Sequence, residues 1–228
     1  DVTLLEGSGL YQSIVDTCQK VSETYPQVDQ QQLLNAAHSA WPKAWQETKI
    51  PWQTGLLSGK EQSFEAWRQT LLTYGLDDEE AISLASTTQL ALYRETHQLY
   101  PDVEPIFAFL SGQNCRLGLM TNGASDTQRE KLITVGLESR FDVIAISGEV
   151  GDRKPNPKIF DFVLEQIDIP PTKALMIGDN LGTDILGARQ AGWKSAWINR
   201  SEAKPSLEIV PDFTIDSLTE LIDILPTI

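Results

Sequence analysis

Short apolar runs alternate with helical stretches through the second half of the 228-residue chain, and this alternation restricts its fold most strongly. The runs are RLGLMTNG at 116–123, FDVIAISGE at 141–149, ALMIGDN at 174–180 and KSAWINR at 194–200, with helical stretches at 126–136, 156–167 and 183–191. A last run, PDFTIDSLTELIDIL, predicts a short strand and a closing helix. Such alternation indicates an α/β fold, a Rossmann-like parallel sheet covered on both faces. Because these sheets bind ligands outside the carboxyl ends of their strands, polar residues there are the candidates for a site.

Residues 9 to about 100 have the pattern of an all-helical block. Apolar residues recur there at three- and four-residue steps, as in Leu33, Ala37 and Trp41, and helix breakers gather at 25–26, 50–59 and 75–78. Four of the six tryptophans lie in this block, at positions 41, 45, 52 and 67. We expect them to fill the core of a small helical domain, because large aromatic side chains usually serve burial. The alternative is that they form a wall of a substrate site.

The net charge and the cysteines indicate which binding partners and which cellular compartment the protein can have. Lys and Arg number 18 against 32 Asp and Glu, so the net charge of −14 disfavours nucleic acids and anionic membranes as partners. An anionic ligand must therefore find a local positive site. Cys18 and Cys115 match no metal or redox spacing, no signal peptide is recognised, and no apolar run approaches the roughly 18 residues of a membrane helix. We expect a cytoplasmic protein, and the sequence indicates no oligomeric state.

Two loops carry groups that suit a phosphate. Thr121 and Asn122 end an apolar run and precede Gly123 and a helix, so a hydroxyl, an amide and backbone N–H groups form a candidate phosphate cradle. An ordinary polar turn is the alternative. Lys154 lies in the proline-stiffened loop GDRKPNPKIF, where a held lysine suits a phosphate or a carboxylate nucleophile. Most lysines are merely solvated, as we expect for Lys158 on the following helix.

Carboxylates follow the run at 174–180 and also open the chain. Asp179 stands at a strand end, and Asp184 comes five positions later in the first turn of the next helix. Hard oxygen ligands grouped in this way suit Mg²⁺, which takes one or two carboxylates together with waters and phosphate oxygens. Helix capping is the alternative for both aspartates. Asp1 and Thr3 resemble the tail of a strand-end D-x-D-x-T-L motif, with Asp1 as its second aspartate.

In this order the four motifs resemble those of the haloacid dehalogenase (HAD) superfamily of phosphatases. They are Asp-x-Thr, then Thr-Asn-Gly after an apolar run, then Lys-Pro-x-Pro-x-Ile-Phe, then Gly-Asp-x-x-x-x-Asp. The resemblance implies a HAD-like core of residues 1–8 and 101–228, with an all-helical cap domain, 9–100, inserted after the first motif. Within the superfamily, TNGASDTQREKL and IGDNLGTDILGARQAGWKSAWINR are most similar to the subgroup of N-acylneuraminate-9-phosphatase and pyrimidine 5′-nucleotidases.

The resemblance also implies an activity and a metal. The chain would be a Mg²⁺-dependent phosphatase that hydrolyses a small phosphorylated metabolite, a nucleotide or a sugar phosphate, through an aspartyl-phosphate. Asp1 would serve as general acid and then general base, and it would add a metal ligand through its carbonyl. Asp179 would bind Mg²⁺, and Asp184 would orient or support the metal shell.

The remaining motif residues would bind the phosphoryl group. By the same resemblance, Thr121, Asn122 and Gly123 would hold the phosphoryl oxygens. Lys154 would neutralise charge between the nucleophile and the phosphate, and it therefore counts as both a catalytic and a phosphate-binding candidate.

The resemblance requires a nucleophile, an aspartate two residues before Asp1, and it places that residue and the sheet's central strand upstream of Asp1. A chain that began at Asp1 would lack both, and we expect it to be inactive and poorly folded. Two other functions fit the motifs: a 2-haloacid dehalogenase, which needs no metal, and a catalytically silent member that binds a phosphorylated ligand or a protein. Asp1 with Asp179 and Asp184 favours the phosphatase, and nothing selects a phosphate-transferring mutase.

Overall fold

A computed structural model of the chain describes residues 2–7, 9–204 and 208–227. Its internal contacts divide the chain into two units. The α/β unit comprises Asp1–Glu6, Gln98–Asn122 and Leu137–Ile228, and the helical unit comprises Gly7–His97 and Gly123–Gly136. The sequence predicted a helical domain at 9–100 and an α/β domain from the rest. The units differ from that division chiefly at residues 123–136, which group with the helices.

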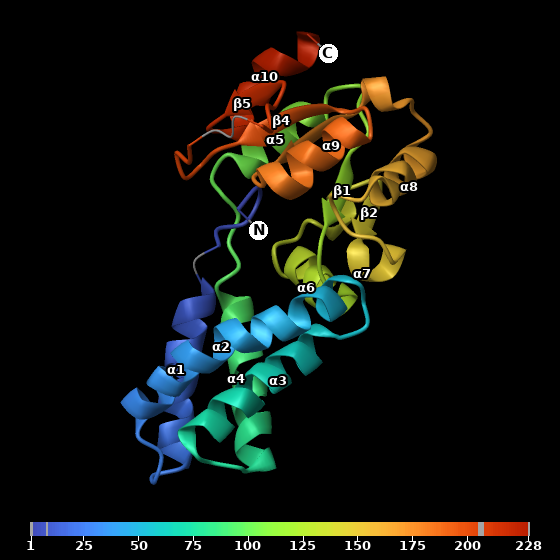
Figure 1. The fold of residues 1–228 in the computed structure, drawn as a ribbon. Coiled ribbons are helices and arrows are strands. Elements are labelled where there is room, and N and C mark those ends of the chain that lie inside the picture. The colour runs from blue at the N-terminus through green and yellow to red at the C-terminus, as the bar shows by residue number, and fades with distance from the viewer. Residues whose placement is uncertain (1, 8, 205–207, 228) are drawn as a thin grey trace. The chain divides into compact units, whose positions relative to one another are not determined.

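The helical unit contains five helices among the described residues (Figure 1). They are α1 (Gly9–Thr24), α2 (Gln30–Gln53), α3 (Gly59–Tyr74), α4 (Glu79–Glu95) and α6 (Ser125–Thr134). Side chains cap the starts of α2, α3 and α4, where Asp29, Ser58 and Asp78 accept hydrogen bonds from backbone N–H groups of the first turn. Gly75, at a φ of 102°, ends α3 in the left-handed conformation that favours glycine. The breakers therefore act as the sequence predicted at these ends.

The tryptophans of the helical unit differ in burial, and Trp41 and Trp52 are both half-buried. Trp67 is fully buried among apolar residues of α1 to α4, and Trp41 packs edge-on against it at 5.9 Å between ring centroids. Trp45 is 38% exposed and pairs with Trp52 at 5.5 Å instead. The prediction of a tryptophan core is confirmed for Trp41 and Trp67 and is wrong for Trp45, because its helical step places it beside the buried stripe of α2.

Helix α6 joins the helical unit through polar contacts with α3 and α4. The Asp126 carboxylate accepts hydrogen bonds from the backbone N–H groups of Gly59 at 2.9 Å and Lys60 at 3.3 Å, and so satisfies two free donors at the start of α3. Glu130 forms an ion pair with Arg94 of α4 at 3.2 Å. These contacts explain why residues 123–136 group with the helices.

The strands of the α/β unit are parallel and coincide with the predicted apolar runs. They are β1 (Gly118–Thr121) paired with β2 (Val143–Ile146), and β3 (Leu175–Gly178), β4 (Lys194–Ile198) and β5 (Phe213–Ile215), paired in that order. The helices are α5 (Val103–Leu110), α7 (Ser147–Val150), α8 (Pro157–Ile167), α9 (Leu186–Gln190) and α10 (Leu221–Ile224). Shorter turns lie at Glu138–Arg140, Pro171–Lys173, Leu218–Glu220 and Leu225–Thr227, and a π-helical turn, η3, at Leu181–Ile185 precedes α9.

The described strands form two sheets, β1-β2 and β3-β4-β5, where the sequence predicted one. The physical reason is that β1 and β3 share no strand partner among the described residues. The sequence analysis had placed the central strand upstream of Asp1, outside the described residues. Helix α8 spans the division, because its Phe160 packs with Ala145 of β2, Met176 of β3 and Ala188 of α9 in one apolar cluster.

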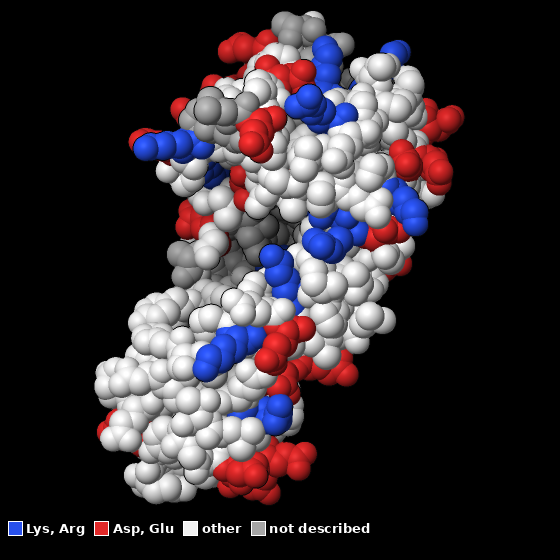
Figure 2. All heavy atoms as spheres, viewed as in Figure 1, with Lys and Arg blue, Asp and Glu red and all other residues white. Residues whose placement is uncertain are grey.

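Charged side chains are mixed on the molecular surface. On the face drawn in Figure 2, Lys and Arg lie singly or in small groups among Asp and Glu, and that face shows no extended basic area among the described residues. Within the part of the chain that the structure describes, no helix combines the length and the apolar character that crossing a bilayer requires.

The two classes of tryptophan should differ in their effect on stability. We expect Trp67→Ala to lower the free energy of unfolding by about 3–5 kcal/mol, because it opens a cavity in the helical core. Trp45→Ala, in the same unit, should cost about 1 kcal/mol, the value of an aromatic pair, because Trp45 itself is exposed. Urea denaturation followed by circular dichroism measures both, and equal losses would contradict the assignment of Trp45 to the surface.

Candidate active site

Three loops of the α/β unit bring the predicted site residues together. The first follows β1, which ends at Thr121. The second, between α7 and α8, carries Lys154, and the third follows β3 and continues into η3. The carboxyl ends of parallel strands are where this class of fold binds ligands, so the position agrees with the prediction.

Asn122 fixes the backbone of Lys154. Its side-chain Oδ1 accepts a hydrogen bond from the Lys154 N–H at 2.8 Å, and its Nδ2 donates to the Lys154 carbonyl at 3.0 Å. Lys154 in turn donates from Nζ to the Met120 carbonyl at 2.9 Å. The sequence suggested a role for the Asn122 backbone and missed this use of its side chain, since no local pattern shows a partner 32 residues away.

Lys154 and Asp184 form a buried ion pair. The Lys154 Nζ lies 2.7 Å from Asp184 Oδ1, and the two side chains are only 11% and 4% exposed. The other oxygen of Asp184 accepts the Asn180 N–H at 3.0 Å. Gly178 makes this approach feasible, because a Cβ on it would collide with the Asp184 carboxylate. Asp184 is thus held between a cation and a backbone donor.

Asp179 lies beside the first motif. Its Oδ1 accepts the Thr3 hydroxyl at 2.6 Å, and its carbonyl accepts the Trp197 indole N–H at 2.9 Å. Its Oδ2 has no hydrogen-bond partner among the described residues. Sequence reasoning missed Trp197, because a tryptophan inside the apolar run of β4 reads as a core residue.

The remaining predicted site residues are Thr121, Gly123 and Asp1. Thr121 ends β1 half-buried. Gly123 has a φ of 151°, and a Cβ there would collide with Gln128 and Trp52 of the helical unit, to which Gly123 belongs. Asp1 lies outside the described residues. The described contacts form two groups: the Thr3 hydroxyl meets the Asp179 carboxylate, and Lys154, held by Asn122, meets Asp184.

The oxygen donors of these loops suit Mg²⁺ only in part. The described residues contain no group of three His, Cys, Asp or Glu that could hold a metal ion by themselves. Mg²⁺ does not need one, since it keeps several waters and commonly takes only one or two carboxylates. Asp179, with one oxygen unengaged, fits such a ligand, whereas both oxygens of Asp184 are engaged by Lys154 and Asn180.

The buried ion pair generates a prediction about stability. Lys154→Met should lower the free energy of unfolding by about 3 kcal/mol, because it leaves the Asp184 carboxylate buried without its cation. Adding Asp184→Asn should recover much of the loss. Lys158→Met is the matched control, because Lys158 is 74% exposed and its change should cost less than about 0.5 kcal/mol. Equal losses for the two lysines in urea denaturation would contradict the buried pair.

Comparison with known proteins places the chain in a family. The sequence model of haloacid dehalogenase-like hydrolases matches residues 3–192. The chain is 35% identical to a phosphoserine phosphatase of Thermus thermophilus over 187 residues, which cover 81% of this chain and 74% of the relative. It is 32% identical to N-acylneuraminate-9-phosphatase of Rattus norvegicus, over 83% of this chain and 67% of that one.

Two further similarities bear on the subgroup and the fold. Over 49% of this chain and 50% of the relative, the chain is 42% identical to the pyrimidine 5′-nucleotidase YjjG of Escherichia coli. Among solved structures it is similar to a protein described as the HAD-hydrolase YfnB of Bacillus subtilis bound to magnesium, with a TM-score of 0.70 and 26% identity over 99% of this chain and 95% of that one. The resemblance that the motifs predicted is confirmed in family and fold, and the chain belongs to the haloacid dehalogenase-like hydrolases.

Proposed function

We propose that this chain belongs to a Mg²⁺-dependent phosphatase for a small phosphate monoester. The observation that carries the proposal is the meeting of Asp179 with Thr3, and of Lys154 with Asp184, at the carboxyl ends of β1 and β3. A held lysine and a carboxylate with a free oxygen are the groups that a phosphate and a divalent cation need.

The charge at these groups supports a metal requirement. By formal charge, Lys154 contributes +1 and Asp179 and Asp184 contribute −1 each, so the three sum to −1. A phosphate monoester, which carries about two negative charges near neutral pH, would be repelled there. A bound Mg²⁺ supplies the charge that lets an anionic nucleophile and an anionic substrate approach each other.

The aspartates would have different roles in binding the metal. We assign Asp179 as a Mg²⁺ ligand together with Asp1, and Asp184 as the support that holds Lys154 and Asn180 in place. The support for this division is that the Asp184 oxygens are already engaged, whereas Asp179 retains an unengaged oxygen.

The phosphoryl group would lie between Lys154 and the loop after β1. Thr121 and the backbone N–H groups of Asn122 and Gly123 would hold its oxygens, and Lys154 would offset their charge. The nucleophile would be an aspartate two positions before Asp1, which forms the aspartyl-phosphate. Asp1 would protonate the leaving oxygen and then take a proton from the attacking water.

The relatives' names suggest the substrate class. They are phosphatases of phosphoserine and of an acylneuraminate 9-phosphate and a pyrimidine 5′-nucleotidase, so the shared chemistry is a phosphate monoester on a small polar metabolite. A 2-haloacid dehalogenase would release halide without a metal, and a silent binding protein would release nothing. Cys18, buried, and Cys115, exposed, are both free thiols, and on that ground we propose a reducing, cytoplasmic setting.

Phosphate release tests the proposal. The natural-length protein should release phosphate from a panel of phosphoserine, an acylneuraminate 9-phosphate and pyrimidine 5′-nucleotides with Mg²⁺ and should lose that activity in EDTA. Asp179→Asn should lower kcat/KM by about 100-fold or more, because it weakens the metal ligand.

Asp161→Asn is the matched control, since Asp161 is exposed on α8 and should leave the activity unchanged. Halide release from 2-haloacids that EDTA does not affect would favour the dehalogenase. A folded natural-length protein that contains the upstream aspartate and releases neither phosphate nor halide would refute the phosphatase.

A further inference from the structure

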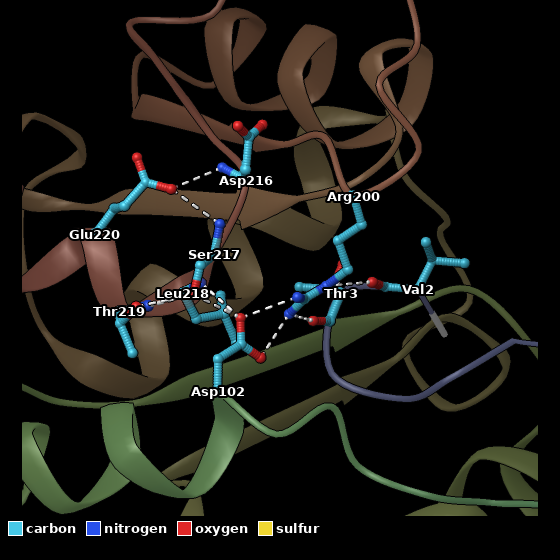
Figure 3. Close-up of polar contacts among 9 residues, drawn as sticks. All are labelled: Val2, Thr3, Asp102, Arg200, Asp216, Ser217, Leu218, Thr219 and Glu220. Atoms are coloured by element: carbon cyan, nitrogen blue, oxygen red, sulfur yellow. Dashed lines mark hydrogen bonds and ion pairs between the residues drawn. The ribbon is translucent and has the colours of Figure 1, made fainter.

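Arg200 lies just after β4 and contacts the segment of the first motif, at Val2 and Thr3 (Figure 3). Its Nε donates to the Val2 carbonyl at 3.1 Å and its Nη2 to the Thr3 carbonyl at 2.9 Å. The guanidinium also stacks on the Tyr100 ring at 3.8 Å from the centroid. One side chain therefore fixes the position of two consecutive carbonyls of the segment that carries Thr3.

Asp102 anchors this guanidinium. Its two oxygens accept hydrogen bonds from Nη1 and Nη2 of Arg200, both at 2.9 Å, and each of the two side chains is 12% exposed. Asp102 also accepts the Ser217 hydroxyl at 3.1 Å and the Leu218 N–H at 2.8 Å, so the anchor extends to the chain after β5 (Figure 3). Burial raises the pKa of Asp102, but the hydrogen bonds from Arg200, Leu218 and Ser217 and the Arg200 charge together hold it below its usual value.

Backbone pairing places the same segment against the strand-like stretch before α5. The Tyr100 N–H donates to the Leu4 carbonyl at 3.0 Å, and the Glu6 N–H donates to the Gln98 carbonyl at 2.9 Å. Leu5 and Leu99 form an antiparallel bridge. The segment is therefore held by this pairing at residues 4–6 and by Arg200 at residues 2 and 3.

Thr3 connects Arg200 to Asp179 of the proposed site. Arg200 holds the Thr3 carbonyl, and the Thr3 hydroxyl donates to Asp179 Oδ1 at 2.6 Å. The rotation and position of that hydroxyl therefore depend on where Arg200 holds the backbone. Residues that orient a metal ligand in this way commonly change activity by about 10–100-fold when they are replaced.

We propose that Arg200, anchored by Asp102, is a positioning residue that fixes Thr3 and through it the Asp179 carboxylate. The inference rests on the proposed function in one respect, namely that Asp179 serves the reaction. Arginine suits the role because its planar fork donates to a carboxylate and to two carbonyls at the same time, whereas a lysine places its three donors around one nitrogen.

The experiment compares Arg200→Lys with the natural-length protein. Arg200→Lys keeps the positive charge but loses the fork, and it should lower kcat by about 10–100-fold with KM for the phosphate ester changed less than about 3-fold. Asp102→Asn should shift kcat in the same direction, because it releases the same guanidinium. Hydrogen exchange followed by mass spectrometry should show faster exchange at the Glu6 and Tyr100 amides in both variants.

Arg140→Lys is the matched control. Arg140 also pairs with a carboxylate, Glu104 at 3.5 Å, and also lies over an aromatic ring, Phe107 at 4.8 Å, but it contacts no site residue among the described contacts. It should leave kcat and the exchange of Glu6 and Tyr100 unchanged. A thermal scan of every variant shows whether the chain remains folded at the assay temperature.

The outcomes separate this inference from the proposed function. Unchanged exchange in Arg200→Lys overturns the inference whatever the activity, and so does faster exchange with a normal kcat. A fall in kcat that Arg140→Lys reproduces also overturns it. If the natural-length protein hydrolyses no phosphate ester, the proposed function fails, and the exchange of Glu6 and Tyr100 alone then decides whether Arg200 positions the segment.

Discussion

The buried ion pair between Lys154 and Asp184 ties together parts of the α/β unit that belong to different sheets. Lys154 is held by Asn122 and donates to the Met120 carbonyl of β1, and it reaches Asp184 beyond β3. Since β1 and β3 share no strand partner among the described residues, these contacts and the apolar face of α8 link the two sheets. The proposed site and the packing of the unit therefore depend on the same few side chains.

The secondary structure was predictable because each element is set by residues close together in sequence. Every predicted apolar run forms a strand, and the breaks near Pro26 and Gly75 end helices. Helix α2 is the exception, because it passes through Pro42 and Pro51 to Gln53 although the sequence predicted a break from residue 50. A proline removes one hydrogen bond of the helix, and burial of the α2 face against its neighbours offsets that loss.

The residues of the candidate site could be chosen from the sequence, but the side chains and carbonyls that they contact could not. Asp179 could be identified because it stands at a strand end, where parallel sheets bind ligands, and Lys154 because its loop is stiffened by prolines. The clamp of Asn122 on Lys154 spans 32 residues, and the pairing of Arg200 with Asp102 spans 98. Sequence periodicity does not predict contacts between residues so far apart in the chain, because these contacts depend on how the strands and loops pack in three dimensions.

The two buried ion pairs are better explained by the backbone carbonyls that their cations hold in place than by a gain in the stability of the fold. Removing two ions from water costs about as much as their attraction returns, so an apolar pair of similar volume would stabilise the fold equally well. An apolar pair could not hold the carbonyls of Val2, Thr3 and Met120, which Arg200 and Lys154 do. Each cation is also paired with a carboxylate of the same chain, so the positive charge that Lys154 would present to a phosphate is balanced by Asp184. A phosphate at this site would therefore need a cation beyond those that the described residues provide.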